Sequence, residues 1–264
     1  MKALFYKLIR PLHRPITKYL RNRLTRNFID YPEINLPNPW ELVQLQVERH
    51  LHNYLHCQAE EIKNIVIVGA NYADEIPRLK RMYTKSRFVC YEPSPKWFEM
   101  LEKNYADCDY VTSKKLAISD FNGPATFYEL PMPGNGSLLN PDVELWSKFN
   151  NWADKKTHAF AVEVKTLDEE MESLDSVDLL WVDVQGGEGG VLRGATKTLA
   201  KTKAVLLEIA ISKSPYEGAV LFDQLDSLLR SQGFSCAGLG LDPWNYTGNA
   251  FWIKNCSDLI CKKS

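Results

Sequence analysis

Residues that could bind a ligand follow two predicted strands in the first half of the chain. Residues 64–71 are rich in β-branched side chains and end in the turn Gly69, Ala70 and Asn71, where glycine lets the backbone approach a ligand closely. Glu92 ends the next apolar segment, 23 residues after Gly69. In Rossmann-like folds an acid about 20 residues beyond the glycine turn binds ribose, because one carboxylate can accept hydrogen bonds from both hydroxyls of a diol. The spacing predicts a nucleoside-containing ligand, the alternative being a surface acid at a strand end.

The residues of the glycine turn also help to distinguish between the possible nucleoside cofactors. Nicotinamide dinucleotides need the pattern G-x-G-x-x-G, whose glycines and helix N-terminus hold a pyrophosphate. This chain has Gly69 and then the acids Asp74 and Glu75, which would repel a pyrophosphate. S-adenosylmethionine has no phosphate and carries a cationic sulfonium and an ammonium group, so acids are compatible with it. We therefore expect this methyl donor, and a nicotinamide-dependent oxidoreductase is the less favoured alternative.

Two further acids surround a glycine turn in the second half of the chain. The buried strand predicted within 178–188 runs through Asp183 into a pair of glycines and ends at Glu188. Methyl transfer to a hydroxyl needs aligned reactants and a general base. Asp183 and Glu188 are therefore the candidate catalytic residues. As alternatives, Asp183 is a structural residue at a strand end, and Glu188 stabilises the N-terminus of the next helix.

Other candidates have weaker support. His158 lies in a predicted insertion, where a base titrating near neutrality and a plain surface residue are both possible. Asp183 and Glu208 could join a metal site, but no spacing demands one and we expect no metal. Aromatic residues outside the core strands suit either the faces of sugar rings or ordinary packing. They are Tyr128, Trp146, Trp152, Tyr216, Trp244 and Tyr246.

An alternation of strands and helices begins near residue 63 and positions these residues. The expected strands are 64–71, 87–93, 110–119, 178–188, 204–210, 234–240 and 249–255. The expected helices are 40–56, 74–84, 95–106, 189–200 and 217–231, with a short strand and helix start in 161–170. Repeated βα units predict an α/β fold with a Rossmann-like, mostly parallel seven-stranded sheet and helices on both faces. The last two strands are expected as an antiparallel pair at one edge.

Charge divides the chain into a basic N-terminal extension and an acidic body. Residues 1–26 contain eight basic residues and no acid, so they carry +8 of a net charge of −1 and the remainder carries −9. We expect an extension over 1–60, with helical segments and a proline-rich linker at 31–40, and a domain over 61–264 with a β-rich insertion near 121–160. The basic arm could contact an anionic membrane surface or be a solvated extension. The acidic body argues against nucleic-acid binding.

Composition places the chain among ordinary globular proteins. Of 264 residues, 45% are hydrophobic and 25% charged, enough to bury a sizeable core. The six cysteines form no CxxC pair, and Cys90 lies in a predicted buried strand, which favours free thiols in a reducing cytoplasm. No apolar run approaches the ~20 residues that span a membrane, and Lys7 and Arg10 interrupt the one stretch that could resemble a signal peptide. We expect a cytoplasmic location, with membrane contact limited to the arm.

Five segments together resemble the FkbM family of methyltransferases. They are 65–75, 90–95, 116–123, 164–169 and 181–195, and they occur in the family's order over roughly residues 60–255. The combination is fairly specific, whereas each segment alone is not. The resemblance implies a class I methyltransferase fold, S-adenosylmethionine as donor and O-methylation of a hydroxyl on a sugar, glycan or secondary metabolite.

The resemblance also implies roles for individual positions. The donor-binding residues, by position, are Gly69 and Asn71 for the methionine side, Glu92 for ribose, Pro93 for the following loop, and Ser119 and Asp120 for the adenine edge. Asp183, Gln185, Gly186 and Glu188 resemble the family's D-x-E-G-x-E motif, which faces the methyl group and the acceptor. The glycine-rich loop before Ser137 matches a small-residue loop near the acceptor.

Three positions depart from the family pattern. Ile67 stands where the family usually has Asp, Ala73 where it has a second Gly, and Gln185 where it has Glu. The change at Gln185 removes a possible charged ligand or base. These departures keep open an alternative reading, a non-catalytic S-adenosylmethionine-binding or interaction module with a degenerate site.

Overall fold

The computed structural model describes residues 47–55, 62–131, 134–142, 144–146, 157–241 and 247–255. The basic arm 1–26 and the linker 31–40 lie outside these residues, as do Trp152, Trp244 and Tyr246. Within the described part, no helix is long and apolar enough to cross a membrane.

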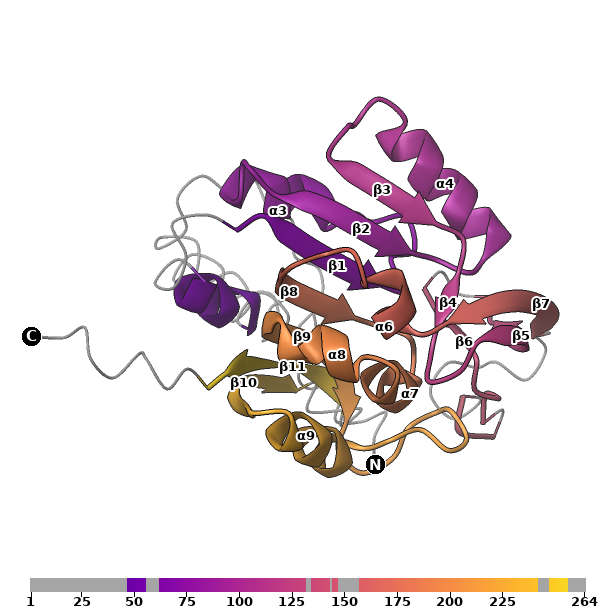
Figure 1. The fold of residues 1–264 in the computed structure, drawn as a ribbon. Coiled ribbons are helices and arrows are strands. Elements are labelled where there is room, and N and C mark those ends of the chain that lie inside the picture. The colour runs from indigo at the N-terminus through magenta and orange to yellow at the C-terminus, as the bar shows by residue number, and fades with distance from the viewer. Residues whose placement is uncertain are drawn as a thin grey trace, which may run out of the picture.

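The central element is a seven-stranded sheet with the order β10-β11-β9-β8-β1-β2-β3 (Figure 1). The pairs β1–β2, β2–β3, β1–β8 and β8–β9 are parallel, whereas β11 is antiparallel to both of its neighbours. The strands are β1 Asn64–Val68, β2 Arg87–Tyr91, β3 Val111–Lys114, β8 Val177–Val182, β9 Thr202–Ala210, β10 Phe234–Leu241 and β11 Thr247–Lys254. The predicted mostly parallel sheet and its antiparallel C-terminal pair are confirmed.

Alternation along the strands creates two hydrophobic cores, one on each face of the sheet. Val66 and Val68 of β1 face one core, and Ile65 and Ile67 face the other. This period of two is what an extended backbone requires, and it explains why β8 is buried at every position. The buried thiol of Cys90 belongs to the second core, as predicted.

Helices cover both faces, as predicted (Figure 1). The helices against the first core are α6 Leu167–Glu170, α7 Glu188–Arg193, α8 Thr196–Ala200 and α9 Phe222–Ser231. Those against the second are residues 47–55, α3 Ile76–Met82 and α4 Pro95–Tyr105.

The single helix predicted at 189–200 is wrong, since it is interrupted between α7 and α8. At Gly194 a Cβ atom would lie 2.1 Å from the carbonyl oxygen of Ser119, so the chain passes this point only as glycine. The helix expected from residue 217 begins instead at Phe222.

A second, four-stranded sheet with the order β4-β7-β5-β6 lies beside the carboxyl ends of the main sheet (Figure 1). Its strands are β4 Ala117–Ile118, β5 Gly123–Glu129, β6 Gly136–Ser137 and β7 His158–Lys165. The predicted single strand over 110–119 is therefore wrong, because its end leaves the main sheet and pairs with β7. The β-rich insertion is also wider than the predicted 121–160, since its sheet extends from 117 to 165.

Candidate active site

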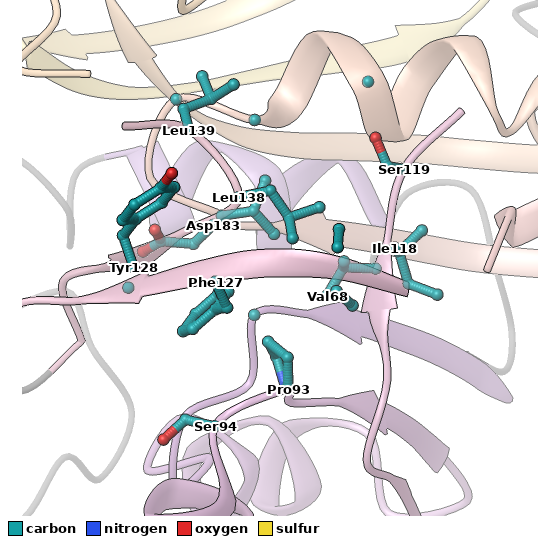
Figure 2. Close-up of a pocket in the computed structure, with 18 of the residues that line it drawn as sticks. Val68, Pro93, Ser94, Ile118, Ser119, Phe127, Tyr128, Leu138, Leu139 and Asp183 are labelled. Atoms are coloured by element: carbon teal, nitrogen blue, oxygen red, sulfur yellow. The ribbon is translucent and has the colours of Figure 1, made fainter. Parts of the chain in front are cut away.

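A pocket of about 370 Å³ lies between the carboxyl ends of the main sheet and the second sheet. This size is typical of small-ligand sites. Figure 2 shows Val68, Pro93, Ile118 and Asp183 around it, with Phe127 carried by β5. The predicted donor-site residues that line it are Gly69, Asn71, Glu92, Pro93, Ser119, Asp120 and Asp183. Two predicted site residues, Ala70 and Glu188, are buried beside the pocket and do not line it.

The turn after β1 depends on glycine. Gly69 has φ +80°, and a Cβ there would lie 1.8 Å from the carbonyl oxygen of Asp183. The backbone amides of Gly69 and Ala70 both donate to the carbonyl of Tyr91 at 2.9 Å, which ties the ends of β1 and β2 together. Asn71 continues the turn with φ +50°, a conformation that Asn tolerates better than most residues.

Glu92 connects two backbone segments under the pocket. Its Oε2 accepts from the amide of Asn71 and its Oε1 from the amide of Ser94, each at 2.8 Å. Burial raises its pKa to about 7, against these two hydrogen bonds and with a smaller raising effect from Glu129 and Asp183. Each carboxylate oxygen keeps further acceptor capacity, so Glu92 can also accept from a ligand diol.

Ser119 and Asp120 form an edge of the pocket against α7. Asp120 accepts from Nε of Arg193 at 2.7 Å in a half-exposed ion pair. At Gly190, a Cβ would lie 2.5 Å from Oγ of Ser119, so only glycine lets α7 pack this closely. Gly190 and Gly194 both serve this contact, because a Cβ at either position would overlap Ser119.

The turn after β8 gathers two carboxyl groups around an amide. Nε2 of Gln185 donates to Oδ1 of Asp183 at 2.7 Å and to Oε2 of Glu208 at 2.6 Å. The hydroxyl of Tyr216 donates to Oε1 of Gln185 at 3.3 Å, which fixes the orientation of the amide. Gln185 has φ +54°, an unfavourable conformation for a side chain of this kind, held by these contacts.

Burial dominates the electrostatics of this turn. It raises the pKa of Asp183, and it raises the pKa of Glu208 well above its ordinary value, reinforced by the charges of Asp183 and Glu188. The two carboxyl groups lie close together, since both accept from Nε2 of Gln185. Of the pair, Asp183 lines the pocket and Glu208 lies behind it on β9.

The carboxyl group of Glu188 binds backbone amides of the turn after β8. Its Oε1 accepts from the amides of Val184 at 3.1 Å and Gly186 at 3.2 Å, and burial raises its pKa to about 7. As the first residue of α7, it occupies the position expected of a helix-stabilising acid. Its role as base remains a prediction that no pocket contact supports.

The departures from the family pattern have plain structural settings. Ile67 is buried in the second core, where an acid would have to be accommodated among apolar side chains. Ala73 is fully buried with φ +55°, a conformation in which glycine would be unstrained. Gln185 takes part in the acid cluster, where it supplies a donor that Glu could not.

Several other predicted candidates do not reach the pocket. His158 is exposed at the start of β7. Trp146 and Tyr216 pack edge-to-face at 5.8 Å in a small buried cluster, which supports the packing interpretation of both. Asp74 and Glu75 also do not line the pocket, so its acidity comes from other residues.

The wall formed by the second sheet was largely missed. Phe127 and Glu129 of β5 line the pocket together with Leu138 and Trp97, and Oγ of Ser94 donates to Oε1 of Glu129 at 2.5 Å. Two signals in the sequence pointed to this wall, namely the glycine-rich loop before Ser137 and the aromatic candidate Tyr128, which lies on β5 and lines the pocket (Figure 2). Nothing in the sequence indicated that β5 would fold over the ends of β1 and β2.

The lining fits S-adenosylmethionine. Among the described residues, four acids line the pocket, Glu92, Asp120, Glu129 and Asp183, and the one basic residue, Arg193, is already paired. In addition, Oδ1 of Asn71 is buried and accepts no hydrogen bond from the described residues, so it is available to a ligand donor. A cationic ligand with N–H and O–H donors satisfies this set, whereas a pyrophosphate does not. In the described ranges, the pocket included, no group of three His, Cys, Asp or Glu residues could hold a metal ion.

Comparison with known proteins gives consistent matches. Residues 68–236 match the methyltransferase FkbM domain. The chain is 29% identical over 180 residues to the 2-O-methyltransferase NoeI of Sinorhizobium fredii, covering 63% of this chain and 71% of that protein. It is 31% identical over 187 residues to Methyltransferase 1 of Beauveria bassiana, covering 66% and 72%. It is 25% identical over 190 residues to the hexuronic acid methyltransferase AglP of Haloferax volcanii, covering 70% and 72%.

Proposed function

The chain belongs to the FkbM methyltransferase family, and from that premise we propose that it methylates a hydroxyl on a neutral sugar, glycan or secondary metabolite. S-adenosylmethionine, when bound, supplies a methyl carbon activated by the sulfonium. The observation that carries the proposal is the convergence of seven predicted donor-site residues, scattered from Gly69 to Asp183, on one pocket.

Each group in the pocket has a task in this reaction. Glu92 and Asn71 are suited to the ribose and the methionine side of the donor, and Ser119 and Asp120 to the adenine edge. Asp183 is suited to take the proton of the acceptor hydroxyl, because it lines the pocket and its partners Gln185 and Glu208 hold it in place.

The charge of the lining argues for a neutral acceptor. Four acids and one paired arginine line the described part of the pocket, so an acceptor with its own carboxylate would be repelled. The name of one relative mentions a hexuronic acid, and the acidic lining argues against an acceptor of that kind for this chain. Apolar side chains such as Phe127, Leu138 and Leu139 suit the apolar face of a ring.

The experiment that tests the function begins with donor binding. Titration calorimetry with S-adenosylmethionine and S-adenosylhomocysteine is expected to show binding that Glu92→Ala weakens. Transfer of radiolabelled methyl groups to a panel of neutral glycosides and matched uronates follows, and the neutral members are expected to react. Binding without transfer to any acceptor would support the non-catalytic module, and absence of binding would overturn the assignment.

The remaining parts of the proposal concern the extension and the location. We assign residues 1–60 to an extension and 61–264 to the methyltransferase domain of a cytoplasmic protein. The eight basic residues of 1–26 suit contact with an anionic surface. Deleting 1–26 is expected to abolish co-sedimentation with anionic liposomes, and unchanged sedimentation would remove the membrane contact from the proposal.

A further inference from the structure

We propose that Asp183 and Glu208 share one proton in the free protein and release it when S-adenosylmethionine binds, so that donor binding prepares the base. The inference rests on the proposed function and deepens it. It adds Glu208, a residue outside the pocket lining, to the proton-transfer machinery.

The geometry of the pair favours one shared proton. Asp183 and Glu208 each place an oxygen against the same amide nitrogen, so two like charges would lie side by side in a partly buried site if both groups were ionised. Gln185 contributes a single Nε2 group that donates to both, at 2.7 Å and 2.6 Å. Because the Tyr216 hydroxyl donates to the other end of the amide, Gln185 presents its donor to the acids in a fixed orientation.

The surroundings of the pair offer no compensating cation in the described structure. Glu188 at the start of α7 adds a like charge, and burial of Tyr216 keeps its hydroxyl neutral by raising its pKa. From β11 the residue opposite Glu208 is the uncharged Asn249. Across the pocket, Glu92 also interacts with the charge of Asp183. The surroundings therefore disfavour a second negative charge on the pair, and they do so most strongly at Glu208.

A cation in the pocket changes this balance. Asp183 faces the pocket, so a positive charge there stabilises the ionised pair by direct Coulomb attraction in a partly dry site. The shared proton then leaves to solvent. S-adenosylhomocysteine lacks the sulfonium charge and is otherwise similar, so it should leave the proton in place.

The proton released on binding balances the one gained in the reaction. As the acceptor oxygen forms its bond to the methyl carbon, the bond from that carbon to sulfur breaks and its electron pair goes to the sulfur. The hydroxyl proton passes to Asp183 and is shared with Glu208. After the uncharged product leaves, the pair holds one proton again.

Calorimetry of donor binding in two buffers tests this without any acceptor. At pH 7, titrations in phosphate and in Tris give the number of protons released, from the dependence of the heat on buffer ionisation. We expect S-adenosylmethionine to release more protons than S-adenosylhomocysteine, by roughly half a proton to one. Equal release by both ligands, with both bound, overturns this inference and leaves the proposed function standing. No binding of either overturns the proposed function and this inference with it.

Variants test whether the released proton comes from Asp183 and Glu208. Glu208→Gln is expected to abolish the difference between the two ligands, and Glu172→Gln, a change of an exposed acid on the first-core side, is expected to preserve it. Glu188→Gln is also expected to preserve most of the difference, because its carboxylate is held by backbone amides of the turn. A difference that persists in Glu208→Gln contradicts the proposal. If Glu208→Gln does not fold, the wild-type comparison still decides.

Discussion

The two walls of the pocket are built by different means. The wall from the main sheet consists of backbone turns at the ends of β1, β2 and β8, with Gly69 against the carbonyl of Asp183 and Glu92 accepting from two amides. The wall from the second sheet presents side chains of β5 and of the segment after β6, including Phe127 and Leu138. One wall therefore allows almost no change of shape, whereas the other can change by ordinary substitution.

This difference suggests a division of labour. A donor common to a whole family suits a wall fixed by backbone, and an acceptor that differs between relatives suits a wall made of exchangeable side chains.

The largest effect is expected for Gly69→Ala in the main-sheet wall. The new Cβ would overlap the carbonyl of Asp183 and require a left-handed backbone, so we expect about 3 kcal/mol lower stability and loss of donor binding. Urea unfolding and calorimetry measure both. The matched control is Gly218→Ala, with φ +76° and open space around it, which should cost only about 1 kcal/mol. Equal costs would show that the contact with Asp183 is not the limiting one.

A smaller effect separates two acids on opposite walls. In Glu92→Gln, the amide group would face a backbone N–H of Asn71 or Ser94, so donor affinity should fall roughly 10- to 100-fold. In Glu129→Gln, the side chain can still accept from Ser94, so donor affinity should change less than about twofold. Calorimetry with S-adenosylmethionine decides, and similar losses in both variants would contradict the division between the walls.

A pH effect is expected at the main-sheet wall. Burial raises the pKa of Glu188 from 4.5 to about 7. Between these values the folded protein keeps the proton and the unfolded chain has lost it. The stability of the free protein therefore falls as pH rises through this interval. Glu188→Gln keeps the accepting oxygen and removes the titration. The Tm of the variant relative to wild type should therefore rise between pH 5 and pH 7.5. The expected rise is about 2–4 °C for each kcal/mol of stability that wild type loses through this titration. A constant difference would mean that Glu188 does not titrate in this range.

The smallest effect on stability and donor binding is expected in the second-sheet wall. Leu138→Ala removes part of an apolar surface that faces the pocket, so the acceptor KM should rise several-fold, about 1 kcal/mol, while the donor Kd stays within about twofold. Steady-state kinetics and calorimetry separate the two. Leu239→Ala, at an exposed site on β10, is the control for general loss of a leucine. A large change in donor affinity would mean that the walls are not independent.

The centre of the main sheet could be predicted because its strands are apolar runs. The runs predicted as buried strands within 64–71 and 178–188 form β1 and β8, and Gly69, Glu92 and Asp183 follow from their places at strand ends. These features are local, since periodicity and turn chemistry determine them within a few residues.

The predictions from the sequence that were wrong or incomplete share a different cause. The need for glycine at Gly194 comes from Ser119, which is 75 positions earlier in the chain, and the division between β3 and β4 comes from pairing with β7. Glu208 was noticed only as a possible metal ligand, because its partners Asp183 and Gln185 lie on another strand end. Contacts between distant segments decide all three features, and hydrophobic periodicity does not predict such contacts.

The pairing of β4 with β7 has a consequence for how such a protein can diversify. Ala117 lies opposite Val164 and Ile118 opposite Lys165, so the segment between them begins and ends on two adjacent strands of the second sheet. A loop whose ends meet can change length at a small entropic cost, about 0.6 kcal/mol per doubling. The segment can in this sense be exchanged as a unit, and exchanging residues 123–165 between relatives, with Ser119 and Asp120 kept, offers a direct route to new acceptor specificity on an unchanged donor site.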